Sequence, residues 1–463
     1  MTRRACHHCD EFTRASLVRA GVAQAGRGLP AIEPGMPLPA GTGLDRRAFV
    51  SRTVGLALTV YGASALRPAA LEEGIARAAV GGAGNRVLVS VFMPGGADAL
   101  SILYPPFDGR YRRLRPQLAL KAGDGPRFRE DGRLHWHPSL KPFAELHTQG
   151  KLTVFPSIGY TRPDQSHFTS RHYWEVGALD YRESTGWLGR LLDLVGDPEN
   201  AMQGLSLDGN LQPSLATARV PVSTLSSPSD YGFRSHYVWD VVEELMMDAV
   251  GGLGGLARHP DPVLARASAT AAQASQLRRQ LRRLVGKDGE VKPNGKAGYP
   301  ENDFGRRLAG LAAMLDRGFP VRAVALTAPG DYDTHADQSG PLNDGLATVA
   351  EGLAAFQRDL EQRGLASRVL TLVWSEFGRR AEQNADNGTD HGAAGTAFLL
   401  GAKARGAMVG EWAGLRRLDR DGNLRATSDF RAVYSSLLEQ WFDVDAERVI
   451  PDAKRMPRYR LVG

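Results

Sequence analysis

Five short apolar runs recur along the chain, and segments with helical patterns or polar loops separate them. The runs are nearly continuous rather than alternating, which is typical of strands in a parallel sheet that is covered on both faces. They read RVLVSVFM (86–93), GKLTVFPSIGY (150–160), VRAVALTAP (321–329), SRVLTLVW (367–374) and TAFLLGA (396–402). The pattern predicts an α/β fold with a doubly wound, mostly parallel sheet and helices on both faces.

A helical insertion is predicted between the second and third of these runs. YVWDVVEELMMDAV (237–250) and SATAAQASQLRRQLRRLVGK (268–287) carry apolar residues at helical spacing, and the Gly- and Lys-rich segment after them is typical of a loop. We expect one α/β domain over residues 85–460, with the insertion at about residues 237–316.

The segment before the first strand has the order of features of an export signal. In LDRRAFVSRTVGLALTVYGASAL (44–66), the paired Arg46 and Arg47 precede a Gly- and Ala-rich apolar segment and then the small residues Ala63-Ser64-Ala65. This order indicates a twin-arginine signal, with cleavage expected after Ala65. The apolar segment is too short and too rich in Gly and Ala for a stable membrane span, so an uncleaved anchor is the less favoured alternative.

The signal defines three regions of the chain. Residues 1–65 are expected to be a leader that engages the twin-arginine translocation machinery, and the Ala- and Gly-rich residues 66–84 a linker. The mature protein is then expected in the periplasm or outside the bacterial cell. Both cysteines lie in the leader, in ACHHCDEF (5–12). This Cys pair could bind zinc or belong to a solvated leader, because one CxxC is an incomplete structural site.

Composition narrows the classes of function. The chain has 463 residues, of which 42% are hydrophobic and 23% charged, so a globular protein with a large core is expected. The net charge is +6 and the isoelectric point is about 9.3. No long Lys/Arg run and no basic–aromatic pattern suggests a nucleic-acid groove, so we expect no nucleic-acid partner. The dispersed basic residues instead favour an anionic substrate.

Polar side chains gather after four of the predicted strands, at the edge where ligands bind in open α/β sheets. Carboxylates and imidazoles are ligands for divalent ions, with zinc or manganese favoured over calcium. A lone Asp or His in such a place is also typical of a helix cap or a buried structural histidine, but several clusters at one edge favour a metal site. The metal-ligand candidates are Asp98, Asp331, Asp333, His335, Glu376, Asp390 and His391, and the catalytic candidates are Ser166, His167 and Arg379.

Seven motifs carry a resemblance to a known family. In chain order they are VFMPGGADALS, YRRLRPQLAL, LHWHPSLKP, SHFTSRHYWEVG, YDTHADQ, SEFGRR and TDHG. With these motifs the chain resembles the exported bacterial proteins catalogued as domain of unknown function 1501. That family in turn resembles the alkaline phosphatase and sulfatase superfamily, which implies an alkaline phosphatase-like fold and a metal-dependent hydrolase.

The resemblance implies roles for individual positions. Asp98 takes the place of the acid after the first strand, and Ser166 that of the nucleophile at a helix start. Asp331 or Asp333 would bind one metal ion together with His335 and His391. The other ion would have Asp98 and Glu376, with Ser166 as an optional third ligand, but Phe377 stands where the superfamily has a histidine. A phenyl ring cannot ligate a metal, so we expect a single ion.

The resemblance also suggests a mechanism for ester hydrolysis. The ion and Arg379 or Arg380 would neutralise an anionic group while Ser166 attacks, with His167 as an alternative base. Other readings remain open: Ser166 caps a helix while His167 packs under Trp174, and both arginines form surface salt bridges. SSPSD (226–230) lacks the arginine of the C/S-x-P-x-R motif, which disfavours a formylglycine sulfatase.

Two functions follow from these observations. The first is an exported metal-dependent hydrolase of phosphate or sulfate esters that acts on an anionic small molecule or a glycan ester. The alternative is a catalytically degenerate member of the same fold that acts as an exported ligand-binding or surface-assembly protein. Glu376 and Phe377 favour this second function, because they replace an Asp-His pair of the superfamily.

Overall fold

The computed structural model describes residues 60–61 and, with gaps, the chain from residue 86 to residue 463. The described residues are 60–61, 86–197, 200–226, 228, 245–246, 248–249, 251–252, 272, 275, 277–286, 291 and 294–463. Most of the predicted leader, the Cys pair and the linker lie outside them, and so does much of the predicted helical insertion. Within the described residues, no helix is long and apolar enough to cross a membrane.

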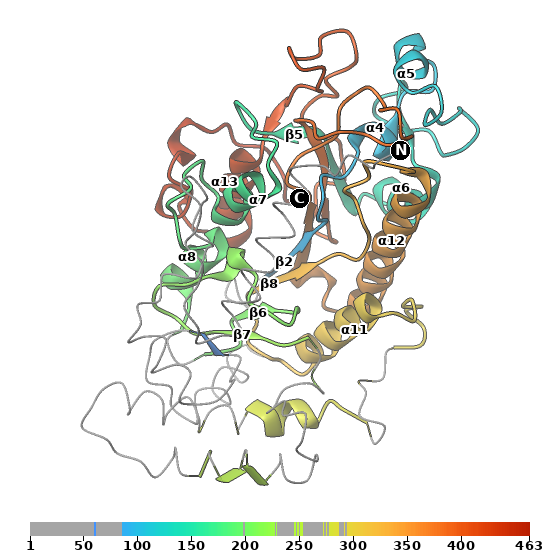
Figure 1. Cartoon of the computed structure of the whole chain (residues 1–463). Coiled ribbons are helices and arrows are strands. Elements are labelled where there is room, and N and C mark those ends of the chain that lie inside the picture. Colours follow the sequence, from blue (N-terminus) through green and yellow to red (C-terminus); the bar gives the residue numbers. More distant parts are fainter. Residues whose placement is uncertain are drawn as a thin grey trace, which may run out of the picture.

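A nine-stranded mixed sheet forms the centre of the molecule (Figure 1). Strands β1 and β10 run antiparallel to their neighbours, whereas the other strands run parallel to one another. The order across the sheet is β1 (Val60–Tyr61), β7 (Val222–Thr224), β6 (Gly204–Ser206), β8 (Ala323–Thr327), β2 (Val87–Phe92), β9 (Val369–Trp374), β10 (Gly395–Leu400), β5 (Leu152–Gly159) and β11 (Ser428–Asp429). A separate hairpin pairs β3 (Leu103–Tyr104) with β4 (His135–Trp136).

Helices cover both faces of the sheet, as Figure 1 shows. On one face lie α4 (Ala99–Ile102), α5 (Gly109–Leu114), α6 (Lys141–Thr148), α11 (Asp303–Asp316) and α12 (Ser339–Gln362). On the other face lie α7 (His167–Val176), α8 (Trp187–Val195) and α13 (Phe430–Phe442). Short 3-10 turns connect them: η2 (Pro138–Leu140), η3 (Pro213–Leu215), η5 (Ala366–Arg368), η6 (Ala446–Arg448) and η7 (Ala453–Arg455).

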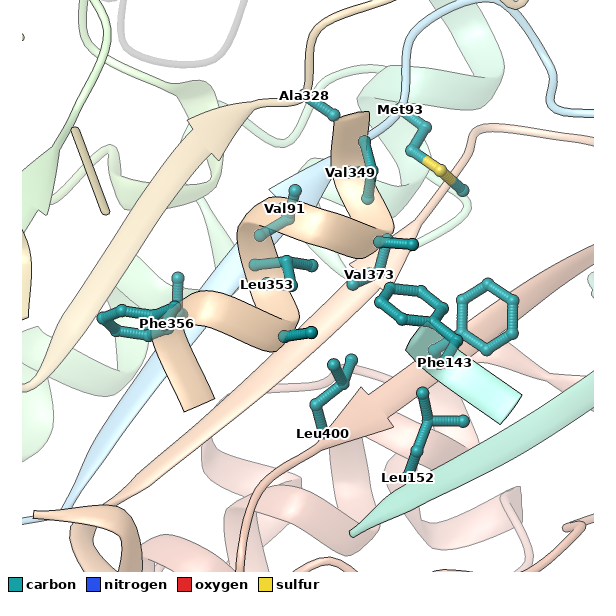
Figure 2. Close-up of a cluster of buried hydrophobic side chains, with 14 of the residues drawn as sticks. Val91, Met93, Phe143, Leu152, Ala328, Val349, Leu353, Phe356, Val373 and Leu400 are labelled. Carbon is teal, nitrogen blue, oxygen red and sulfur yellow. The ribbon is translucent and has the colours of Figure 1, made fainter. Parts of the chain in front are cut away.

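The central strands divide their side chains between two hydrophobic cores. In β2, Val89 and Val91 belong to the core under α12, whereas Leu88 and Phe92 belong to the core under α13. Figure 2 shows the first core, where Val91 lies near Leu353 of α12. Both faces of each strand are therefore apolar, which explains the continuous apolar runs in the sequence. The predicted doubly wound, mostly parallel sheet is confirmed.

All five predicted strands are present, but the last one runs in the opposite direction to most of the sheet. β10 is antiparallel to both β9 and β5. Because antiparallel neighbours need no crossover helix, residues 375–394 connect β9 to β10 along a single edge. The start of β10 therefore lies at the same edge as the ends of β2, β5, β8 and β9, and the polar loops meet there.

Candidate metal centre

Four polar side chains converge at the edge of the sheet. His167 is the first residue of α7, Asp333 and His335 follow β8, and His391 precedes β10. The Nε2 atoms of His167, His335 and His391 lie 3.4, 3.0 and 3.2 Å from Oδ1 of Asp333. The Nε2 atoms of His335 and His391 are 3.0 Å apart. One carboxylate oxygen is thus surrounded by three imidazole nitrogens.

An acceptor occupies the opposite nitrogen of each ring. The three Nδ1 contacts are His167 with Glu376 Oε1 at 2.7 Å, His335 with Asp390 Oδ1 at 3.3 Å, and His391 with the carbonyl of Gln165 at 2.8 Å. Carboxylates and carbonyls only accept hydrogen bonds, so each Nδ1 carries the proton. In the neutral ring, Nε2 then presents its lone pair to the cluster. Metal-binding histidines usually have such an acceptor on the nitrogen that faces away from the ion.

The ligand atoms of His167, Asp333 and His391 lie within 4.8 Å of one another, and Asp333 Oδ1 and the Nε2 atoms of His335 and His391 have the mutual spacing of ligands in a tetrahedral site. Bonds of 2.0–2.1 Å to zinc place the ligand atoms of a tetrahedron about 3.4 Å apart. The distances from Asp333 Oδ1 to the three imidazoles, and between His335 and His391, are 3.0–3.4 Å. Without a cation or a shared proton, the lone pairs of His335 and His391 would repel each other. The donor set of three imidazoles and one carboxylate suits zinc or manganese.

The electrostatics of the cluster agree with a site for a cation. Burial alone would lower the pKa of His167, but its hydrogen bonds with Asp333 and Glu376 raise it to about 9. Burial would raise the pKa of Asp333, yet the three histidines and Arg379 hold it far below its usual range. The pKa of His391 is lowered, first by burial and also by the charges of Arg379 and His167. Asp333 is therefore anionic, and without an ion a proton on His167 partly compensates it.

Glu376 is held by the turn between β2 and α4. Its carboxylate accepts hydrogen bonds from the backbone N–H of Gly95, at 2.9 and 3.2 Å, and of Gly96, at 3.1 Å. Both glycines have positive φ, +111° and +73°, and a Cβ would overlap Asp333 at Gly95 and the Phe377 ring at Gly96. The Gly-Gly turn thus lets the backbone approach the site closely.

Arg379 is buried beneath the cluster and crosslinks its loops. Its side chain is 0% exposed, and its guanidinium donates to the carbonyls of Gly96 and Thr389 at 2.9 and 2.7 Å. It also donates to the Gly95 and Tyr332 carbonyls and to Asp333 Oδ1. These contacts leave Arg379 as neither a surface salt bridge nor an exposed fork for a substrate.

Phe377 packs against two of the histidines, whose own rings contact each other with centroids 4.4 Å apart. Its ring centroid lies 4.9 Å from those of His167 and His391, and the side chain is buried. An apolar ring therefore fills the position where the resemblance would place a ligand of a second ion.

The remaining predicted site residues lie around the cluster rather than in it. Asp390 and Glu376 contact the back of histidines, and Asp331 is exposed and accepts a hydrogen bond from the Asp333 N–H at 3.0 Å. Asp98 lies in a buried ion pair with Arg115. Ser166 takes the N-cap position of α7, half-buried, without a side-chain capping hydrogen bond.

Sequence reasoning named His167 as a base, and the structure adds it to the cluster around Asp333. The sequence carried a signal for this position, since SHF (166–168) starts the predicted helix that follows the strand at 150–160. The buried partners Arg115 and Gln338, described below, were missed, because nothing local in the sequence marks them as inward-facing.

The comparison with protein families finds one match. The model described as "Protein of unknown function (DUF1501)" matches residues 243–448, which include Asp333, His335, Arg379 and His391. The resemblance to this family is confirmed. The segments of the DUF1501-like chain that carry Asp98 and His167 lie before the matched residues. The comparison with curated proteins finds no match.

Several solved structures are similar to this DUF1501-like chain. PsFucS1 sulfatase from Pseudoalteromonas sp. is 13% identical, with 82% of this chain and 73% of that chain covered and a TM-score of 0.34. A protein in the alkaline phosphatase superfamily from Vibrio parahaemolyticus is 10% identical, with 81% and 71% covered and a TM-score of 0.33. Phosphonate monoester hydrolase SpPMH from Silicibacter pomeroyi is 12% identical, with 81% and 78% covered and a TM-score of 0.31.

Proposed function

We propose that this protein is a metal-dependent hydrolase of phosphate or sulfate esters with one divalent ion, zinc or manganese. Asp333, His167, His335 and His391 would hold the ion. The observation that carries the proposal is the convergence of three imidazole Nε2 atoms on one carboxylate oxygen, each with an acceptor on its Nδ1. When bound, the ion supplies positive charge that offsets the negative charge of the ester oxygens.

Ser166 is the proposed nucleophile. It lies directly before His167 at the N-terminus of α7, where the helix dipole favours negative charge. Because its side chain does not cap the helix, the hydroxyl is available for chemistry. Its Oγ would form a bond to phosphorus or sulfur while the bond to the leaving oxygen breaks, and the hydroxyl proton would pass to the leaving alcohol. Water would then release phosphate or sulfate and restore the serine.

Asp333, Glu376 and Arg379 have different proposed roles. Asp333 is a ligand, and Glu376 orients His167 through Nδ1. Arg379 holds Asp333 and the surrounding carbonyls, so it positions the site and does not bind the substrate. The anionic small-molecule or glycan ester and the export through the twin-arginine route remain parts of the proposal. Export rests on Arg46 and Arg47.

The ligand-binding or surface-assembly alternative has one specific observation in its favour. Phe377, which cannot ligate a metal, packs against both His167 and His391, so the edge offers fewer ligands than a two-ion phosphatase would have. A protein with this site could retain an ion and hold an anionic ligand without cleaving it.

Elemental analysis and turnover by the purified protein test the proposal. We expect one equivalent of zinc or manganese per chain and cleavage of an aryl phosphate or aryl sulfate. His335→Gln should weaken metal binding by at least tenfold, whereas His172→Gln should retain it. His172 is the matched control because it is a buried histidine of α7 whose Nε2 contacts the Asp180 carbonyl instead of the cluster.

The outcomes separate the two functions. Protein that takes up neither ion, even after incubation with zinc or manganese, would contradict the metal centre. Metal without turnover of either ester would support the ligand-binding alternative. Ser166→Ala that binds metal normally but loses turnover would identify the serine as the nucleophile, whereas unchanged turnover would rule it out.

A further inference from the structure

A buried hydrogen-bond network lies behind the metal centre. Asp98, the N-cap of α4, is 1% exposed, and Arg115 is 0% exposed. Arg115 Nη2 donates to Asp98 Oδ1 at 2.9 Å, and Nη1 pairs with Oδ2. Ser101 Oγ and Gln338 Nε2 also donate to Oδ2, at 2.6 and 2.7 Å. A buried carboxylate needs such compensation, and this one receives a complete set of donors.

Arg115 keeps Asp98 ionised. Burial alone would raise the pKa of Asp98, but the charge and hydrogen bonds of Arg115 outweigh it and lower the pKa. Arg115 also donates to the carbonyls of Arg380 and Ala381, at 2.9 and 3.0 Å. The guanidinium is therefore a cation fixed within the fold that neutralises Asp98, the position at which the sequence suggested a second ion.

Gln338 connects Asp98 to the two loops of the metal centre. Its Oε1 accepts hydrogen bonds from Thr334 Oγ1 at 3.0 Å and from Thr389 Oγ1 at 2.5 Å. Thr334 lies between Asp333 and His335 in the sequence, and Thr389 lies two residues before His391. The backbone N–H of Thr389 also donates to the Thr334 carbonyl at 3.0 Å. The side-chain amide of Gln338 thus joins the same loops that backbone hydrogen bonds connect, such as those from Thr389 N–H to the Thr334 carbonyl and from Asp337 N–H to the Asp386 carbonyl.

The orientation of the Gln338 amide follows from the charge on Asp98. An ionised carboxylate only accepts hydrogen bonds, so it requires the NH₂ group of Gln338. The amide oxygen is then directed to the two threonine hydroxyls, which can both donate to it. A reversed amide would leave its oxygen against the carboxylate and lose the Asp98 contact. The ion pair therefore determines which atom of Gln338 faces the metal loops.

We infer that Gln338 is a positioning residue that sets the separation of the Asp333–His335 loop from the His391 loop. Asp98 and Arg115 fix its amide. The inference rests on the proposed function, because it assigns a role to the network in metal binding. The His335–His391 contact of 3.0 Å spans the two loops, so a change in their separation moves the ligands relative to each other. Changes to residues that hold metal ligands in place typically weaken metal binding 10- to 100-fold.

Gln338→Met tests the inference, with Gln357→Met as its control. Gln357 is a buried glutamine within α12, whereas Gln338 is the N-cap of that helix, and Gln357 Nε2 donates to Glu361 Oε1 one turn further along. Two quantities are measured in the full chain: zinc affinity by competition, and hydrogen exchange of the Thr389 amide in metal-free protein. We expect Gln338→Met to weaken zinc affinity 10- to 100-fold and to speed exchange at least tenfold, while Gln357→Met changes neither.

A second pair of variants isolates the hydroxyl of Thr389. Thr389→Ser keeps the donor to Gln338, whereas Thr389→Val keeps the shape without the donor. Zinc affinity and exchange should stay near wild type in the serine variant and change in the valine variant. If both variants behave alike, or if Gln338→Met equals Gln357→Met in both measurements, the inference is overturned.

The exchange measurement separates this inference from the proposed function. If the wild-type chain binds neither zinc nor manganese, the metal centre is wrong. The Thr389 amide then still reports whether Gln338 holds the two loops together. Normal exchange in Gln338→Met would reject the positioning role even if the wild-type chain binds metal.

Discussion

At the scale of single residues, the part that each acid plays depends on which side of an imidazole it contacts. Asp333 faces the Nε2 atoms, whereas Glu376 and Asp390 face Nδ1 atoms. The sequence predicted all three as ligands, because it shows that an acid follows a strand but not how far its loop extends. For the same reason the sequence could not show which of Arg379 and Arg380 points into the site. In the structure Arg379 is fully buried, whereas Arg380 is not.

Glu376→Gln tests the orienting role of this carboxylate. The amide keeps the shape, but it removes the charge that supports His167 through Nδ1. We expect zinc affinity to fall 10- to 100-fold with little change in overall fold. Glu175→Gln is the control, because Glu175 is equally buried but pairs with Arg171 instead of a site histidine. Competition with a zinc chelator gives the affinities, and equal values for the two variants would contradict the role.

At the scale of elements, the apolar runs predicted the five longer strands, because strands covered on both faces have a distinctive sequence. The strands β1, β3, β4, β6, β7 and β11 were missed, since two or three residues carry too little pattern. The reversal of β10 was also missed. The direction of a strand depends on how the chain connects it to its neighbour, which the residues of the strand do not show. The reversed direction of β10 nevertheless matters, because it places His391 at the site.

The turn between β2 and α4 offers a matched test of close packing. Gly96 and Gly150 both have φ of +73°, but a Cβ at Gly96 would overlap the Phe377 ring, whereas a Cβ at Gly150 meets nothing within 4 Å. Ala at Gly150 should cost about 1 kcal/mol in the free energy of unfolding, from backbone strain alone. Ala at Gly96 should cost about 1–3 kcal/mol more, because of the overlap. Urea unfolding measures both, and equal losses would show that the turn is not tightly packed.

At the scale of the whole molecule, a buried neutral histidine contributes to the dependence of stability on pH. His137 is 2% exposed, and its Nδ1 accepts a hydrogen bond from the Ser139 N–H at 3.1 Å. Burial lowers its pKa to about 4, although the charge of Asp98 and a hydrogen bond with Asn343 oppose this shift. The unfolded chain, with a pKa near 6.5, therefore takes up a proton before the folded chain does.

Acid should destabilise the fold partly through this histidine. Its contribution is fully present above pH 6.5 and is lost as the pH falls toward 4, which amounts to roughly 2–3 kcal/mol. His137→Asn keeps a capping acceptor for η2 but does not titrate. We expect the variant to lose less stability between pH 7 and pH 4.5 than the wild type does. Urea unfolding at pH 7 and pH 4.5 gives the free energy of unfolding of both proteins. Equal losses in the variant and the wild type would contradict a contribution from His137.

The position of β2 in the sheet has a consequence for biosynthesis. β2 pairs with β8 on one side and with β9 on the other. Residues 87–92 therefore cannot form their hydrogen bonds in the sheet until residues 323–327 and 369–374 have been synthesised. A nascent polypeptide holds its central strand without either neighbour until most of the chain has left the ribosome. Such long-range pairing slows folding and leaves an apolar strand exposed meanwhile. The loops with Asp333 and His391 can therefore meet His167 only at the end of translation or after it, once β8 and β9 are available to pair with β2.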